Sequence, residues 1–137
     1  METQRVIASL DEEAVAALER LLPMDRMTII RPAETGLLMV TAIDAFQTDF
    51  YLGEMLATEV EVAYEGADGY ALLAGADVKR AILAAATDAV MQDKDGLLAR
   101  QVAGFLEAQA EKTAAGQTAE RRMIAATMVD FETMNPG

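Results

Sequence analysis

The stretch RPAETG, residues 31–36, holds the side chains whose types and spacing come closest to a binding or catalytic loop. An arginine fork pairs well with phosphate oxygens, and a neighbouring hydroxyl can add a further hydrogen bond. Arg31, Glu34 and Thr35 could therefore bind an anionic ligand. The proline and glycine of the same stretch are equally typical of a polar turn. The local sequence favours the turn and leaves ligand binding open.

Carboxylates are the remaining candidates for acid–base chemistry, because the chain contains neither histidine nor cysteine. Serine–histidine triads, thiolate nucleophiles and the usual zinc sites are thereby excluded. Glu34 and Glu54 could act as a general acid and base if the two connections that hold them met at one end of a sheet. The acidic residues from Glu54 to Asp68 could bind magnesium, but Glu59 and Glu61 at strand spacing more simply keep one sheet face hydrated. We favour this structural interpretation.

Charge and hydropathy restrict the partners of the chain. A net charge of −12 argues against nucleic acid, because binding its backbone relies on clustered lysine and arginine. No apolar run approaches the ~20 residues that span a bilayer. The first residues, METQRVIASL, lack the basic and apolar regions of a signal peptide. We therefore expect a cytoplasmic protein that contacts neither nucleic acid nor membrane.

Capping residues mark the starts of helices. The sequence SLDE forms a capping box between Ser9 and Glu12, and Pro23 ends the helix that follows. Asp77 is the expected N-cap of a second amphipathic helix. Gly116 separates two further helical stretches. The predicted helices cover residues 10–22, 78–90, 97–112 and 118–128.

Apolar residues that are β-branched or alternate with polar ones predict strands. MLATEVEVAY, residues 55–64, is typical of a half-buried strand. LLMVTAI, residues 37–43, is apolar on both faces, which places it in the middle of a sheet or under a partner. RPAETG, FQTDFYLGE and EGADG then connect neighbouring strands, and Gly53 offers a bend or a bulge. The predicted strands cover residues 27–31, 37–43, 55–64 and 69–75.

This order of elements predicts an α+β fold. We expect a four-stranded antiparallel sheet with N-terminal and C-terminal helices packed on one of its faces. A length of 137 residues predicts a single domain over residues 1–137.

The segment VDFETM carries apolar residues beyond the last predicted helix. Segments near a chain end are usually poorly ordered unless they are docked. Val129, Phe131 and Met134 therefore suggest a segment that docks onto another subunit. The alternative is that Phe131 folds back onto the sheet of its own chain.

Five motifs occur in order from about Arg31 to Met134 and are specific in combination. They are IRPAETGL, FYLGEMLATEVEV, DGYALLAGAD, ATDAVMQ and VDFETM. Together they resemble the G subunit of the bacterial carbon–phosphorus lyase system for phosphonate utilisation.

The resemblance implies a non-catalytic subunit of a hetero-oligomeric core complex with the H, I and J subunits, of which the I subunit is the expected direct partner. In that system the G, H, I and L proteins attach a phosphonate to C1′ of a nucleoside triphosphate, as α-D-ribose 1-methylphosphonate 5-triphosphate synthase. The complex is expected to use MgATP. S-adenosylmethionine and an iron–sulfur cluster are expected on the J subunit, and no cofactor or catalytic residue is expected on this chain.

The resemblance also implies which residues meet a partner, with Arg31 and Glu34 contacting it or each other across the turn. The expected partner-binding residues are Arg31, Glu34, Thr35, Gly53, Glu54, Thr58, Val129, Asp130, Phe131 and Met134. Two alternatives remain at this point. One is a small stand-alone enzyme that uses the Glu34 and Glu54 carboxylates. The other is a self-associating binding module whose apolar sheet face meets its own copy.

Overall fold

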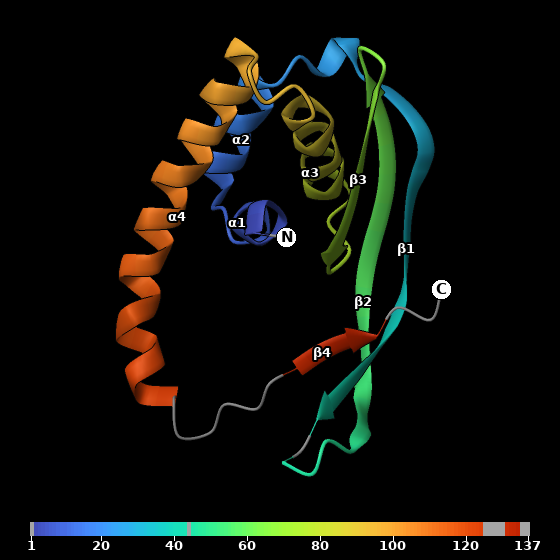
Figure 1. Ribbon diagram of the computed structural model, residues 1–137, viewed down its shortest axis with the longest axis vertical. Helices are drawn as coiled ribbons and strands as arrows, with labels where there is room; N and C mark the ends of the chain where they lie inside the picture. Colours follow the sequence, from blue (N-terminus) through green and yellow to red (C-terminus); the bar gives the residue numbers. More distant parts are fainter. Residues whose placement is uncertain (1, 44, 125–130, 135–137) are drawn as a thin grey trace.

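The computed structural model describes residues 2–43, 45–124 and 131–134, with side chains placed for residues 3–43 and 45–112 (Figure 1). Two short helices lead into an antiparallel sheet, which further helices follow. The elements are α1 (Glu2–Ala8), α2 (Glu12–Leu21), the 3-10 turn η1 (Met24–Arg26), β1 (Thr28–Ile43), β2 (Asp49–Tyr64), β3 (Ala67–Ala74), α3 (Val78–Met91), α4 (Leu97–Ile124) and β4 (Phe131–Met134). The predicted α+β class is confirmed.

The stretch RPAETG lies inside β1 and is not a turn, so the predicted hairpin is wrong. The first two predicted strands form one strand of 16 residues. Proline is tolerated in an edge strand or at a bulge, where its missing N–H is not needed. The register with β2 shifts between Ile29 and Arg31 and again between Arg31 and Glu34, so Pro32 sits in an irregular part of the edge.

The four predicted strands therefore form only three, β1 to β3, and the sheet is extended by β4, for which the sequence predicts no strand. Its order is β3–β2–β1–β4, in which β4 is a four-residue segment that pairs with residues 39–42 of β1. The connection from β1 to β2 is also shorter than predicted, because β2 begins at Asp49. Gly53 lies inside β2 and not in the predicted connection. Of the bend, bulge or close backbone approach that it offered, the structure shows a bulge, since the register shifts between Val40 and Thr41 and Gly53 has a φ of 153°.

The helices begin at acidic caps. Asp11, and not Ser9, caps α2 by accepting a hydrogen bond from the Ala14 N–H at 2.8 Å. The Ser9 hydroxyl instead donates to the carbonyl of the preceding helical turn. Asp77 caps α3 as predicted, accepting from the Arg80 N–H at 3.0 Å.

The two helices predicted after α3 are one, because α4 continues through Gly116. A single glycine costs a helix only about 1 kcal/mol relative to alanine, and the good helix formers Ala115 and Gln117 flank this one.

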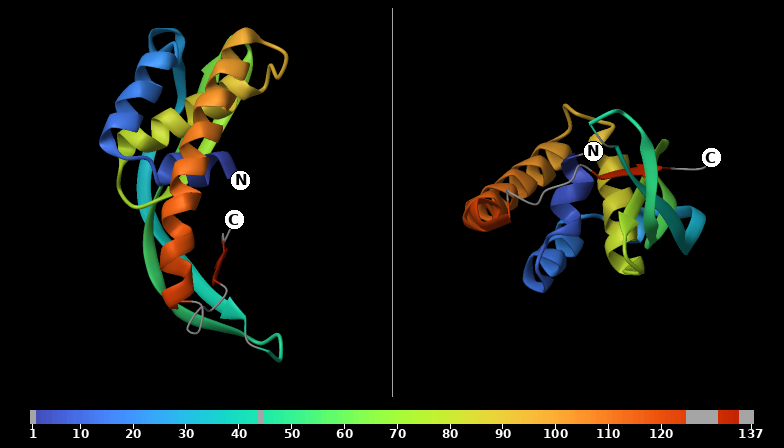
Figure 2. Two further views of the ribbon diagram at one scale, coloured as in Figure 1. Left: turned by 90° about the vertical axis from the view of Figure 1, so that its left-hand side faces the viewer. Right: turned by 90° about the horizontal axis from the view of Figure 1, so that it is seen from below.

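The helices lie on one side of the sheet, with α3 against β2 and β3 and with α4 outermost (Figures 1 and 2). Apolar side chains from all these layers form one core. Its fully buried members include Ile7, Leu18, Val60, Val62, Leu83 and Val102. Among the described residues, no helix combines the length and apolar character needed to cross a membrane.

Arg80 ties the N-terminal helices to α3. Its Nη1 donates to the carbonyl oxygens of Ile7 at 2.8 Å and of Leu10 at 2.6 Å. Its Nε donates to the Asp77 carboxylate at 3.2 Å, and only 14% of the side chain is exposed. A cation that satisfies the last carbonyls of α1 thus fixes the angle between α1 and the rest of the fold.

The β1–β2 hairpin extends beyond this core. β3 pairs with β2 only from Ala57 to Tyr64, and α1, α2 and α3 end at the same level (Figure 2). We call residues 37–43 and 45–56, which extend beyond, the arm. Its outer edge on β1 is paired with β4.

Replacement of Gly69 tests the close packing of α3 on the sheet. A Cβ at Gly69 would lie 2.0 Å from the Ala85 carbonyl oxygen and 2.5 Å from the Ala89 nitrogen, so the helix must move. We expect Gly69→Ala to lower the free energy of unfolding by on the order of 1–3 kcal/mol in urea titrations. The control Gly36→Ala meets no atom within 4 Å and should change it by less than about 0.5 kcal/mol. Equal stability of the two variants would contradict this packing.

The cap at Asp77 makes stability depend on pH. The Arg80 N–H, and then its guanidinium, hold the pKa of Asp77 below its usual 3.8. The folded-state pKa is thus lower than the unfolded one, so the contribution is present above pH 3.8 and is lost as the pH falls further. We expect Asp77→Ala to cost about 1 kcal/mol at pH 7 and less at pH 3. Asp77→Asn keeps the acceptor without the charge, and its own stability should lack this acid dependence; parallel pH profiles of wild type and Asp77→Asn would refute the assignment.

Candidate partner-binding surface

Glu59 on β2 collects the polar contacts next to RPAETG. One carboxylate oxygen accepts a hydrogen bond from the Tyr70 hydroxyl at 2.7 Å, and the other lies 3.9 Å from Arg31 Nη1. Burial, and then the hydrogen bond to Glu59, raise the pKa of Tyr70 to about 12. Tyr70 is therefore protonated at neutral pH and holds Glu59 as a donor.

Arg31 and Glu34 both face β2 from one continuous strand. Arg31 pairs with Glu59, and 56% of its side chain is exposed. Glu34 lies directly opposite Glu59 in the register. The turn across which the sequence places Arg31 and Glu34 does not exist, and Arg31 approaches the Glu59 carboxylate on the neighbouring strand instead.

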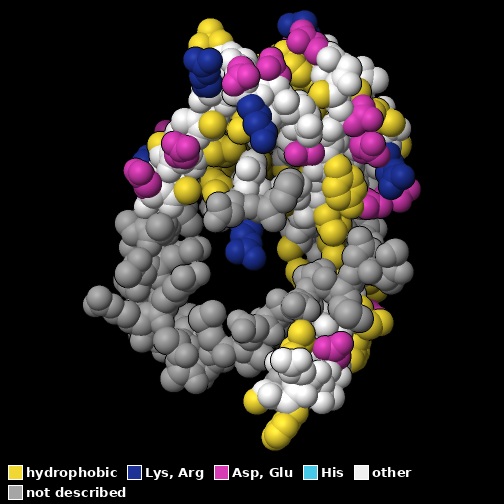
Figure 3. Space-filling model, in the orientation of Figure 1, with side chains coloured by type: hydrophobic (Ala, Val, Ile, Leu, Met, Phe, Trp, Pro, Cys, Tyr) yellow, Lys and Arg dark blue, Asp and Glu magenta, His cyan; other side chains and the backbone are white. Residues whose placement is uncertain are grey.

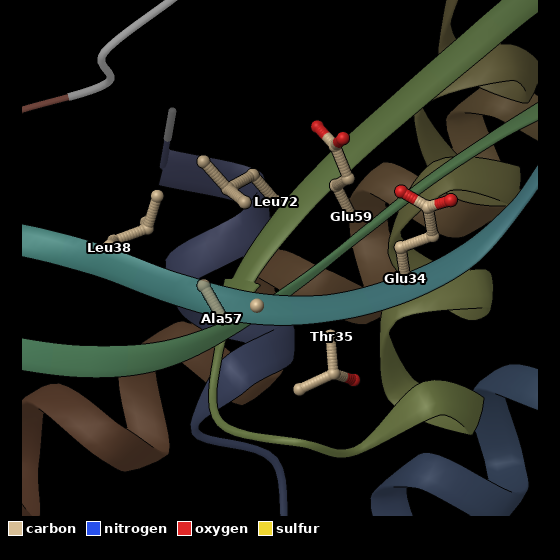
Figure 4. Close-up of a pocket in the computed structure, with 7 residues that line it drawn as sticks. Glu34, Thr35, Leu38, Ala57, Glu59 and Leu72 are labelled. Carbon is tan, nitrogen blue, oxygen red and sulfur yellow. The ribbon is translucent and has the colours of Figure 1, made fainter.

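A shallow cavity of about 210 Å³ lies beside these carboxylates. Figure 4 shows Glu34, Glu59, Leu38 and Leu72 pointing to the same side of the sheet, while Thr35 points to the other. A larger cavity of about 450 Å³ adjoins it where the arm begins. Both are lined by Leu38, Ala57 and Leu72, and the larger one also by Gln4, Arg5, Ala8, Met55, Leu73 and Ala74. Carboxylates and apolar side chains thus share one continuous depression.

Thr35 and Thr58 are brought together by the register. Their hydroxyl oxygens lie 2.9 Å apart, and the Thr58 hydroxyl donates to the Gly75 carbonyl at 2.8 Å. Thr58 gives its only proton to Gly75, so Thr35 is the donor between them. Thr58 is fully buried, and it ties the end of β3 to both long strands.

Glu34 and Glu54 do not form an acid–base pair. Glu54 pairs with Met39, five positions further along β1 than Glu34 and thus roughly 17 Å away. The odd spacing also puts the two carboxylates on opposite faces of the sheet. Sequence reasoning chose the wrong partner because it placed the residues in two turns, whereas the register brings Glu34 to Glu59. Within the described part of the chain, no three acidic side chains gather as a metal-binding group.

Apolar side chains on the arm remain exposed. The sheet face that buries Val60 continues into Leu56 and its partner Leu37, which are 49% and 61% exposed because α3 does not reach them. Near the tip, Phe50 is 44% and Tyr51 is 55% exposed. Residues 39–42 of the strand that is apolar on both faces lie between β2 and β4, which is the first of its predicted settings, the middle of a sheet. Ala42 is buried there, whereas Leu37 remains exposed.

The surface around the arm is acidic. The sequence contains no lysine or arginine between Arg31 and Lys79. Figure 3 shows hydrophobic side chains and an acidic one at the lower end of the arm. Partial desolvation, and then the Glu54 carboxylate, raise the pKa of Tyr51. An apolar surface with an acidic border results.

The C-terminal motif lies partly beside the arm. Val129 and Asp130 fall outside the described residues. The backbone of β4 places Phe131 opposite Ala42 and Met134 opposite Met39. The pairing agrees with the predicted alternative, in which this segment folds back onto the sheet of its own chain. Docking of the segment onto another subunit stays a prediction.

Comparison with known proteins identifies the family. None of the curated proteins matches the chain. A family model described as phosphonate metabolism protein PhnG matches residues 2–137. The match covers all five motifs that suggested the G subunit. The chain belongs to the PhnG family of phosphonate metabolism proteins.

Proposed function

We propose that this chain is a non-catalytic subunit of the carbon–phosphorus lyase core complex, needed there for transfer of a phosphonate to C1′ of a nucleoside triphosphate. Membership of the PhnG family supports the metabolic context. The observation that carries the subunit role is the arm, whose apolar side chains are exposed in the free chain. Large exposed apolar patches are typical of interaction surfaces.

The chemistry of the proposed reaction argues for catalysis on other subunits. Holding a triphosphate calls for clustered cations, and the stretch from residue 32 to residue 78 has none. Moving protons near neutral pH calls for a histidine or a tuned carboxylate pair, and Glu34 and Glu54 lie far apart. The resemblance to the carbon–phosphorus lyase system implies that the I subunit carries the nucleosidase activity, and that S-adenosylmethionine and the iron–sulfur cluster belong to the J subunit. The complex would work in the cytoplasm on MgATP.

Covering the arm would supply the binding energy. Full burial of a leucine or phenylalanine is worth roughly 1.5–3 kcal/mol relative to exposure. Leu37, Leu56 and Phe50 are about half exposed, so each would contribute about half of that. Three such side chains supply roughly 2–5 kcal/mol, a 30-fold to 5,000-fold effect on affinity. The I subunit is the partner proposed for this contact.

Self-association through the same apolar face is a weaker candidate. Two copies would bring together two arms whose own charged residues, Asp49 and Glu54, are acidic. Like charges at an interface oppose association. A heterologous partner with basic residues fits the arm better.

A reconstitution tests the subunit role. We expect the purified chain alone to release no adenine from MgATP in the presence of methylphosphonate, and the assembly with the H, I, J and L proteins to release it. Steady turnover by the isolated chain, lost in Glu34→Gln or Glu54→Gln, would establish the stand-alone carboxylate enzyme instead.

Removal of Arg31 separates assembly from stability. Its ion pair with Glu59 is exposed, so Arg31→Ala should change the free energy of unfolding by only ~0–1 kcal/mol. We expect the same variant to weaken binding to the I subunit severalfold in calorimetry. The matched control is Arg26→Ala, because Arg26 is equally exposed and pairs with Glu65 away from the arm. Indistinguishable binding by both variants and wild type would refute a role for Arg31.

A further inference from the structure

One edge of β2 has no neighbouring strand along the arm. The last backbone contact on that side is the hydrogen bond from the Gly75 N–H to the Leu56 carbonyl at 2.7 Å. Backbone groups of alternate residues face the same side, so the N–H and C=O of Glu54 face it too. Within residues 2–43, 45–124 and 131–134, no strand pairs with Asp49–Met55 there.

The other edges of the sheet are protected. The Gln4 amide donates to the Tyr70 carbonyl at 3.0 Å and accepts from the Leu72 N–H at 3.1 Å, which closes the outer edge of β3. Asp88 accepts from the Tyr70 N–H at 2.9 Å. On β1, Pro32 and two register shifts interrupt the edge, and β4 covers the arm portion. Such devices prevent unwanted strand pairing. The arm edge of β2 has neither proline nor lysine, and its one register shift, at Gly53, leaves Gly53–Leu56 regular.

A cavity stands at the start of this free edge. The depression of about 450 Å³ is bounded by Met55 and Ala57 of β2, by Ala74 at the end of β3, and by Arg5 and Ala8 of α1. A strand that continued the line of β3 along β2 would place a side chain in it. The bulge at Gly53 limits the regular ladder to Gly53–Leu56, the same length as the four-residue pairing of β4 on the opposite edge.

We infer that this edge accepts a β-strand from a heterologous protein partner, a short extended segment with an apolar side chain for the cavity and lysine or arginine beside it. The inference rests on the proposed function, because it describes how the subunit meets its partner. The charge of the surroundings selects the occupant. Glu54, Asp49 and Glu59 lie along the edge or next to it, and they outnumber Arg5, the one cation that lines the cavity. A second copy of this chain would bring an acidic arm and is therefore a poor occupant.

Backbone amide exchange provides the direct test. The full chain is measured by hydrogen exchange free and in complex with the purified I subunit. We expect the Glu54 N–H to exchange at least 10-fold more slowly in the complex. Protection of the arm side chains from labelling, with unchanged exchange at Glu54, would overturn strand addition and leave the subunit role intact.

Two substitutions on the same residue test the edge and its charge. Glu54→Pro removes the N–H that faces the open side without removing a bond to β1, and we expect it to weaken binding to the I subunit at least 10-fold. Glu54→Lys should do the same. Glu61→Lys makes an equal change of charge on the part of β2 that β3 covers, and it should weaken binding less than threefold.

Three other outcomes would overturn the addition of a heterologous strand at this edge of β2. Equal loss of binding in Glu54→Lys and Glu61→Lys would show a general charge effect and overturn the edge assignment. A dimeric isolated chain that becomes monomeric in Glu54→Pro would identify a second copy as the occupant and overturn it too. Absence of wild-type binding to the H, I and J subunits would overturn the proposed function together with this inference. If Glu54→Pro loses its cooperative melt, the exchange measurement on the wild-type chain still decides.

Discussion

The antiparallel pairing of β1 with β2 sets the architecture. Both strands are 16 residues long, whereas β3, which pairs with β2, has only 8 residues. β3 pairs with β2 only from Ala57 onward, since the left-handed Gly75 and the cap at Asp77 end the strand and start α3. Gly69 then lets α3 press against the sheet at that level. Once these positions are fixed, α3 does not reach the rest of the hairpin, and apolar side chains such as Leu37 and Leu56 lie at the surface.

Two carboxylates of like charge lie opposite each other on β1 and β2, and their position near the edge of the core explains why this is tolerated. Glu34 and Glu59 lie opposite each other near the edge of the core, where water and neighbouring donors reduce their repulsion. Tyr70 donates to Glu59, and Arg31 approaches it from the same strand as Glu34. The arrangement has the carboxylates of a catalytic pair but no enclosure, and the cavity beside it is shallow. It therefore suits recognition of a basic group better than proton transfer.

Local patterns predicted the elements that local chemistry decides. Asp77 correctly predicted the start of α3, and the alternation of polar and apolar residues around Val60 correctly predicted a half-buried strand. RPAETG was misleading, because proline and glycine look the same in a turn and in a bulged edge, and only pairing with β2 distinguishes the two. The register shifts also decide that Glu34 meets Glu59 and not Glu54, and no spacing in the sequence encodes them. The sequence shows that residues 37–43 are apolar on both faces. It does not show that part of this segment is exposed, because the exposure depends on where β3 and α3 end.

An exposed apolar arm is an aggregation hazard for the free chain, and the composition offers a physical remedy. The net charge of −12 keeps copies of the chain apart, and the charged residues of the arm itself, Asp49 and Glu54, have the same sign. Self-repulsion acts most strongly where two arms would otherwise meet. A partner with lysine or arginine beside an apolar strand meets attraction in the same place, so one charge distribution both opposes self-association and favours the heterologous contact. The absence of lysine and arginine between Arg31 and Lys79 therefore contributes to recognition of the partner, and is not only a consequence of an acidic sequence.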